Sequence, residues 1–204
     1  RRGTKLFVLS HKESVNWAAY SPDGRRIVTA SSDYSARIWN ADTGSQIGIL
    51  EGHTGNISTA TFSPDGQQIV TASDDGSARI WNTESGKELA VFKEHTHDVY
   101  CAAFSPNGKL IASSSLGGDG TARIWDCTGK TIAVLPGHIS RVSFQDAFSP
   151  DGSLIITSSY DNTSKIWDLE SGKVRASLLG YFASFSPDGC HVVTVDSNTA
   201  RIWS

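Results

Sequence analysis

One short motif returns five times along this sequence at nearly constant spacing. Each copy is a basic residue followed by Ile and Trp, and the copies are Arg37-Ile38-Trp39, Arg79-Ile80-Trp81, Arg123-Ile124-Trp125, Lys165-Ile166-Trp167 and Arg201-Ile202-Trp203. Successive tryptophans are 42, 44, 42 and 36 residues apart. Such a period is typical of an array of small units that bury their apolar surface against one another. The regular features therefore describe architecture, and function is to be sought where the copies differ.

Two turns punctuate each copy. The first is Ser-Pro-Asp-Gly (Ser-Pro-Asn-Gly in the third copy), and it begins at Ser21, Ser63, Ser105, Ser149 and Ser186. Pro presets the backbone of a tight turn, Asp or Asn tolerates the next position, and Gly accepts a positive φ. The second turn is Thr-Gly or Ser-Gly, shortly after each of the first four tryptophans.

Runs rich in β-branched and aromatic residues lie between these turns and predict strands. In the first copy we expect strands over residues 15–20, 26–31, 35–40 and 45–50. Both faces of these strands carry apolar residues, so each four-stranded sheet should lie between two neighbouring sheets. Four-stranded sheets of about 40–45 residues, stacked radially, form a β-propeller.

The repeat resembles that of the WD-repeat family, in which a Gly-His pair precedes a Trp-Asp pair. Gly52-His53 and Gly137-His138 match the first pair, and Trp125-Asp126 and Trp167-Asp168 match the second. Ser10 and Glu94 replace the Gly in two copies, and Asn40, Asn82 and Ser204 replace the Asp in three. The resemblance, to a bacterial type of array, covers nearly the whole chain. It implies an all-β, five-bladed propeller in one domain, 1–204, with blade cores near 11–40, 53–82, 95–126, 138–168 and 180–204.

The two ends of the chain bear on how the ring is closed. Residues 4–10 resemble the fourth strands of the repeats, while the last copy stops after its third strand. We expect the N-terminal strand to complete the last blade, which would remove both open sheet edges. The alternative is a partial ring or a fragment of a larger propeller, because seven blades are common in this family. The fifth copy is also shortened, with 5 residues from Gly180 to Phe185 against 10 from Gly52 to Phe62.

His, hydroxyl and Asp side chains recur in the copies and could be mistaken for nucleophilic triads. The resemblance implies a structural role instead, in a buried network with the repeated Trp. The predicted members are His11, His53, His95, His138, Trp39, Trp81, Trp125, Trp167, Asp33, Asp75 and Asp161. The participating hydroxyl stays open between Thr29 and Ser31 in the first copy, and Asp119 is the candidate partner of His95. Since an active site is normally built once, four parallel copies argue against catalysis, and we predict no catalytic residue.

Other clusters of polar residues have simpler explanations. His95, His97 and Asp98 lack a third strong metal ligand, so we expect no metal and no cofactor. The basic residues before the Ile-Trp pairs are expected to be solvated or paired with acids rather than to form a phosphate-binding ring.

The resemblance to the WD-repeat family implies that a partner binds at the loops between strands. Peptides often dock where the loops entering each blade meet the turns between the second and third strands. These positions vary between the copies, and Tyr and Arg are favoured anchors at interfaces. The predicted partner-binding residues are Tyr100, Arg141, Tyr160, Phe182, Asp98, Asn56, Asn16 and Asp74. The alternative is that each is an ordinary loop residue.

Composition limits the classes of function. The chain has 18 basic and 21 acidic residues, unlike the basic footprint of a nucleic-acid binder. No apolar run approaches the roughly 18 residues of a membrane span. Three distant cysteines suggest thiols in a reducing, cytoplasmic compartment. The absence of Met suggests part of a longer chain.

We therefore predict a non-catalytic platform for a protein or peptide, as the WD-repeat part of a larger signalling or regulatory protein of prokaryotic origin. Self-association is expected if the ring is incomplete. The alternatives are a glycan- or nucleic-acid-associated propeller and an enzyme with a site in the channel. Trp17 is the indole that would serve a glycan site, although it fits a strand core.

Overall fold

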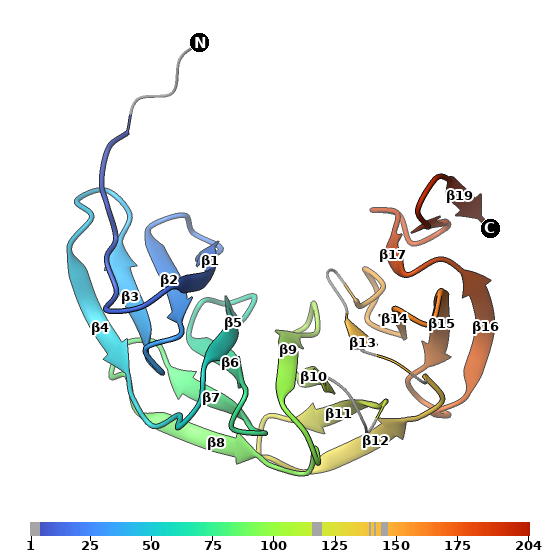
Figure 1. Cartoon of the computed structure of the whole chain (residues 1–204), viewed down its shortest axis with the longest axis horizontal. Coiled ribbons are helices and arrows are strands. Elements are labelled where there is room, and N and C mark those ends of the chain that lie inside the picture. Colours follow the sequence, from blue (N-terminus) through green and yellow to red (C-terminus); the bar gives the residue numbers. More distant parts are fainter. Residues whose placement is uncertain (1–4, 116–119, 139, 141, 144–146) are drawn as a thin grey trace.

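The computed structural model describes residues 5–115, 120–138, 140, 142–143 and 147–204. Throughout these residues the regular secondary structure is β, and no helix long and apolar enough to cross a membrane occurs in them. The strands form five separate antiparallel sheets. These sheets are arranged as the blades of an open arc (Figure 1).

Each blade is a meander in which consecutive strands pair. Blade 1 contains β1 (Val15–Tyr20), β2 (Arg26–Ser31), β3 (Ala36–Asn40) and β4 (Gln46–Leu50). Blade 2 contains β5 (Ile57–Phe62), β6 (Gln68–Ser73), β7 (Ala78–Asn82) and β8 (Glu88–Phe92). Blade 3 contains β9 (Val99–Phe104), β10 (Leu110–Ser115), β11 (Ala122–Asp126) and β12 (Thr131–Leu135). The strands predicted for the first repeat are confirmed to within one residue at each end.

The last two blades are less regular. Blade 4 contains β13 (Val142–Ser143), β14 (Leu154–Ser159), β15 (Thr163–Asp168) and β16 (Val174–Leu179). Blade 5 has three strands, β17 (Phe182–Phe185), β18 (Val192–Val195) and β19 (Ala200–Trp203). Its first strand is short, as the deletion in the fifth repeat predicts. In Figure 1 the first strand of each blade lies on the inside of the arc, and the fourth strands of blades 1 to 4 lie on the outside.

The Ser-Pro-Asp-Gly turns are closed as the sequence predicts. In the first turn the Gly24 amide donates to the Ser21 carbonyl at 2.9 Å, and the Ser21 hydroxyl donates to Asp23 at 2.5 Å. Gly24 has φ +71°, a value that disfavours residues with a Cβ. The carboxylate thus belongs to the turn itself.

Neighbouring blades are joined by apolar residues from both faces of each sheet. Each blade has two faces. We call the face that packs against the next blade along the chain its outgoing face, and the face that packs against the preceding blade its incoming face. At the first junction the outgoing face is Val28, Ala30, Ala36, Ile38 and Leu50, and the incoming face of blade 2 is Ile57, Ala60, Ile69 and Trp81. All nine are buried. Equivalent residues pack the next two junctions, so the core of the protein is a series of interfaces between blades.

The structure does not show the predicted closure of the ring. Residues 5–10 form no strand, and the sheet of blade 5 ends at β19. Figure 1 shows the N-terminal segment beside blade 1 and β19 at the other end of the arc. Each packed junction fixes the angle between two blades, and five blades at these angles leave the ring open.

The junctions should therefore carry most of the stability. Replacing Ile80 by Ala should lower the free energy of unfolding by about 2–5 kcal/mol, because it leaves a cavity between blades 2 and 3. Ile202 has the same place in the repeat but is 77% exposed, so Ile202→Ala in dilute solution should cost less than about 0.5 kcal/mol. Urea unfolding measures both values, and equal losses would contradict the prediction.

Candidate functional site

The repeated polar residues form hydrogen-bond networks inside the blades, and blade 2 shows the full set of contacts. In blade 2 the Thr71 hydroxyl lies 2.7 Å from His53 Nε2 and accepts a hydrogen bond from Trp81 Nε1 at 2.9 Å. His53 Nδ1 lies 2.8 Å from an oxygen of Asp75. That carboxylate also accepts from the Thr54 amide and from Ser77. The network ties the loop entering the blade to the middle strands.

The same network is present in three other blades. In blade 1 the hydroxyl belongs to Thr29, at 2.6 Å from His11 Nε2, which decides between the two predicted candidates. In blade 4 His138 is paired with Thr157 and with Asp161. In blade 3 Ser113 links His95 to Trp125, and the predicted partner Asp119 lies outside the described residues.

Blade 5 has lost the His and keeps the hydrogen bond between its Trp and Thr. Trp203 Nε1 donates to the Thr194 hydroxyl at 2.9 Å, and this hydroxyl donates to the Leu179 carbonyl at 2.7 Å. A backbone oxygen thus takes the place of the imidazole. The half-buried Trp203 indole thus has a hydroxyl acceptor although the His is absent.

Burial makes the network structural rather than catalytic. The side chains of His11, His53 and His138 have no exposed surface. Burial lowers the pKa of His11 and His138, outweighing the opposing effect of the neighbouring carboxylates. Burial alone would raise the pKa of Asp33, but hydrogen bonds from Ser35 and the Lys12 amide hold it well below its usual range. Because these His and Asp side chains are buried, a substrate cannot reach them in the folded chain.

Four of the five repeated basic residues are paired with acids, one of the two environments expected for them. Arg79 is 2.6 Å from Glu88, and Arg123 is 2.9 Å from Glu94. Arg37 is 3.4 Å from Asp33, and Arg201 is 2.6 Å from Asp196. These ion pairs join the third strand of a blade to a nearby turn, outer strand or entering loop.

The predicted binding residues that the structure describes lie on one side of the arc, where one set of loops and turns joins the strands. Because the strands alternate in direction, the loops that enter the blades and the turns between second and third strands share this side, which we call the loop face. Tyr160 follows β14 and is 63% exposed. Its ring is stacked on that of Tyr181, with 6.1 Å between centroids and 7° between planes. Phe182, 37% exposed, directly follows Tyr181.

The other predicted residues are spread along the loop face. Asn16 donates to the Ser32 hydroxyl and to the Ile57 carbonyl, which links blades 1 and 2. Asp74 accepts from Ser58 at 3.4 Å. Asn56 and Asp98 are exposed and Tyr100 is half-buried. The structure thus brings Tyr160 next to Tyr181, the residue that precedes Phe182. The other described binding candidates lie on other blades, and Arg141 lies outside the described residues.

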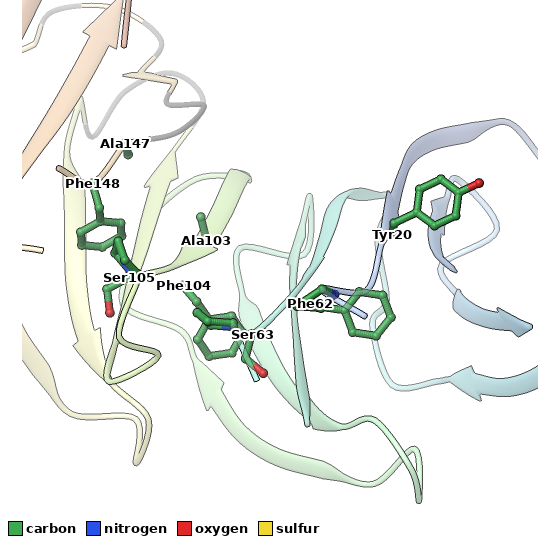
Figure 2. A pocket seen from close by; sticks show the side chains of 11 residues that line it. Tyr20, Phe62, Ser63, Ala103, Phe104, Ser105, Ala147 and Phe148 are labelled. Atoms are coloured by element: carbon green, nitrogen blue, oxygen red, sulfur yellow. The ribbon is translucent and has the colours of Figure 1, made fainter. Parts of the chain in front are cut away.

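A groove at the opposite end of the strands is not among the sequence predictions. It encloses about 340 Å³, and residues that end the first strands of blades 1 to 3, with their turn prolines and Phe148 of blade 4, line it. Figure 2 shows the side chains of Tyr20, Phe62, Phe104 and Phe148 following one another along this groove. The sequence signal was available, because an aromatic residue directly precedes every Ser-Pro pair.

Trp17 does not offer a free stacking platform. It is half-buried and packs against the core of the junction between blades 1 and 2. The indole that was considered for a glycan site therefore contributes to the packing between blades 1 and 2.

Fold and network together define a repeat protein built of stacked four-stranded blades. The family model described as "WD domain, G-beta repeat" matches residues 3–40, 44–82, 86–126, 129–168 and 181–204. The chain belongs to the WD-repeat family.

Curated relatives agree with this family. Nuclear distribution protein PAC1 from Arthroderma benhamiae is 30% identical over 209 aligned residues, which cover 95% of this chain and 36% of that protein. WD repeat-containing protein 86 from Homo sapiens is 42% identical over 43 residues, 21% of this chain and 11% of that protein. The Notchless protein homolog from Arabidopsis thaliana is 41% identical over 51 residues, 25% of this chain and 11% of that protein. The chain thus spans about a third of the length of PAC1, with which it has the longest alignment. Because the relatives named here are eukaryotic, the bacterial origin stays a prediction.

The hydroxyl at the centre of the network should be essential to stability. Thr71→Val removes the acceptor of Trp81 and the partner of His53, and should lower the free energy of unfolding by about 2–3 kcal/mol. Thr83→Val is the matched control, since the buried Thr83 hydroxyl makes no hydrogen bond within the described residues. Urea unfolding of the two variants measures the difference, and a similar loss in both would contradict the assignment.

The buried histidines should make the fold sensitive to acid. In the unfolded chain a histidine binds a proton near pH 6.5, whereas burial lowers the pKa of His11 and His138 in the folded chain. The unfolded state therefore binds more protons below that pH, so the unfolding free energy should fall between about pH 7 and pH 5.

Urea unfolding at several pH values measures this slope. His138→Gln should reduce it, while His97→Gln, at an exposed position, should not. A flat profile for the unsubstituted chain would contradict the prediction.

Proposed function

We propose that this chain is a non-catalytic platform that binds a protein or peptide at its loop face. The observation that carries the proposal is the stacked pair Tyr160 and Tyr181 with Phe182 beside it. Large aromatic side chains in water cost free energy, and Tyr is favoured at the centres of protein interfaces. Here two adjacent blades hold the rings in place, so little conformational entropy remains to be lost on binding.

The enzyme alternative finds no support in the geometry. The residues that could act as nucleophile and base are enclosed in a network that recurs in four blades. Turnover of a substrate by the purified chain would overturn the non-catalytic assignment.

The proposal also covers the parent protein, the cellular location and the class of partner. Membership of the WD-repeat family and relatives much longer than this chain support a role as the interaction part of a larger signalling or regulatory protein. The three widely spaced cysteines, together with this family, support a cytoplasmic location. Carboxylates at Asp74 and Asp98 and the formal net charge of −3 favour a protein partner over nucleic acid.

A selected peptide can test the loop face without knowledge of the natural partner. Peptides chosen from a random display library against the chain should bind wild type and lose about 10- to 30-fold in affinity on Tyr160→Ala, the usual loss at an aromatic anchor. Isothermal titration calorimetry measures the affinity, and thermal unfolding shows that the variant remains folded.

The matched control is Tyr20→Ala, because Tyr20 is also an exposed tyrosine but lines the groove at the other end of the strands. It should bind as wild type does. If Tyr20→Ala abolishes binding and Tyr160→Ala does not, the loop-face assignment is wrong and the groove is the binding site.

A further inference from the structure

A pocket between blades 1 and 2 has polar walls. It has a volume of about 460 Å³ and lies at the end of the strands opposite the loop face. Arg26, the first residue of β2, lines it from blade 1. Two turns of blade 2 provide the other lining residues, which are Gly66, Gln67, Asn82, Thr83 and Glu84. We call this space the Arg26 pocket, and its walls belong to two blades that pack together within this chain.

The equivalent pair of positions at another junction is apolar. Along the repeat, Arg26 corresponds to Leu110 and Thr83 corresponds to Leu169. Both leucines pack against the core that joins blades 3 and 4. At the junction of blades 2 and 3 the residue equivalent to Thr83 is Cys127, which also packs against a core. The packing of two blades therefore does not require the polar pair of Arg26 and Thr83.

The polar groups of the Arg26 pocket lack partners of their own. Thr83 is 5% exposed, and its hydroxyl makes no hydrogen bond within the described residues. Arg26 is half-buried, and the ion pairs in the described part of the chain involve other cations. The Asn82 side-chain oxygen accepts hydrogen bonds from Ser85, which leaves the Asn82 amide nitrogen available to donate. A buried hydroxyl and a partly desolvated guanidinium both cost free energy until an acceptor reaches them.

The guanidinium of Arg26 lies beside the turn of blade 2. A Cβ built on Gly66 would be 3.9 Å from Arg26 Nη2 and 3.5 Å from Pro22. Gly66 has φ +70°, which glycine adopts without strain, so the turn places no side chain under the guanidinium. Pro22 also lines the aromatic groove, so the pocket adjoins that groove. An extended peptide can therefore place one polar group in the pocket and an apolar side chain in the groove.

The available groups are donors, so the ligand must be an acceptor. The guanidinium of Arg26 only donates hydrogen bonds, and its fork matches the two oxygens of a carboxylate. The Thr83 hydroxyl and the Asn82 amide can donate to the same group.

Two acidic side chains limit the charge of the ligand. The exposed Glu84 also lines the pocket. The pKa of Asp23 is lowered mainly by hydrogen bonds from Ser21 and the Arg25 amide and to a smaller extent by the charge of Arg26, so this carboxylate is ionised near the cation. Both would repel a doubly charged phosphate more strongly than a singly charged carboxylate.

We propose that the Arg26 pocket binds one carboxylate of a peptide. Arg26 is its bidentate partner, and the Thr83 hydroxyl is a second donor. The carboxylate belongs to an acidic side chain or to a C-terminus, which share this chemistry. The pocket lies at the opposite end of the strands from the loop face, so it does not depend on binding there.

Nuclear magnetic resonance of the full ¹⁵N-labelled chain tests the pocket with small probes. Glutamic acid blocked at both termini should shift the Arg26 Nε–H and Asn82 amide signals, with saturation at a Kd of about 1–10 mM. Glutamine blocked in the same way has no charge and should not shift them at equal ionic strength. N-acetylalanine, whose carboxylate is terminal, shows whether a C-terminus is accepted as well as a side chain.

Matched variants assign the binding to named groups. Arg26→Gln should weaken the binding of blocked glutamic acid at least tenfold, whereas Arg25→Gln removes an exposed neighbouring cation and should leave it unchanged. Thr83→Val should weaken it about 3- to 10-fold while the stability of the fold is kept. Glu84→Gln should strengthen it because a like charge is removed. Tyr160→Ala should have no effect, and thermal unfolding should show that each variant is folded.

Four results would overturn the proposal. The absence of any shift would mean that water alone occupies the pocket. Equal shifts with blocked glutamine would show that the charge is not recognised. Equal losses with Arg25→Gln and Arg26→Gln would show unspecific attraction to positive charge. Tighter binding of inorganic phosphate than of either carboxylate would make the pocket a site for another anion.

Discussion

Burial of both faces of each sheet is the constraint on which this structure depends. A single four-stranded blade exposes Val, Ile and Ala on one side and Ile and Trp on the other, so it buries its apolar residues fully only between two neighbours. At internal junctions these side chains are buried completely, as Ile57 and Ile80 show. The same residue types become solvent-exposed wherever the series of blades is interrupted. The packing that holds the arc together thus also defines the surfaces at its ends.

The polar network acts within a blade, whereas this packing joins one blade to the next. His, Thr, Trp and Asp fix the loop that enters the blade to its central strands, and in blade 5 the Leu179 carbonyl replaces the missing imidazole. Because the network is satisfied internally, it holds the loops without occupying their outer surface. The exposed Tyr160 ring therefore stacks on the half-buried Tyr181 ring above loops that the network holds in place.

Several sequence predictions concern residues whose environment is local. The strands of the first repeat, the Ser-Pro-Asp-Gly turns and the Trp networks follow from patterns that span less than one blade. The strands and turns are confirmed, and hydrogen bonds such as that from Trp39 to Thr29 link network residues in the described part of the chain. The loop-face residues were predicted by position alone. Which of them lie together depends on contacts between blades, as in the stacking of Tyr160 on Tyr181. The aromatic groove could not be predicted from local sequence patterns, because its residues come from four blades and lie together only in the folded chain.

The sequence by itself determined the repeat, the strands within it, the family and the residues of the network, because each is encoded by short-range patterning of apolar, turn and hydrogen-bonding residues. Only the tertiary structure decided how far five blades travel around a ring, since that depends on the angle that packed side chains impose at each junction. It also decided the place of the N-terminal segment, which lies against Gly44 of blade 1 instead of pairing with β19. The similarity of residues 4–10 to a fourth strand does not say whose sheet that strand completes.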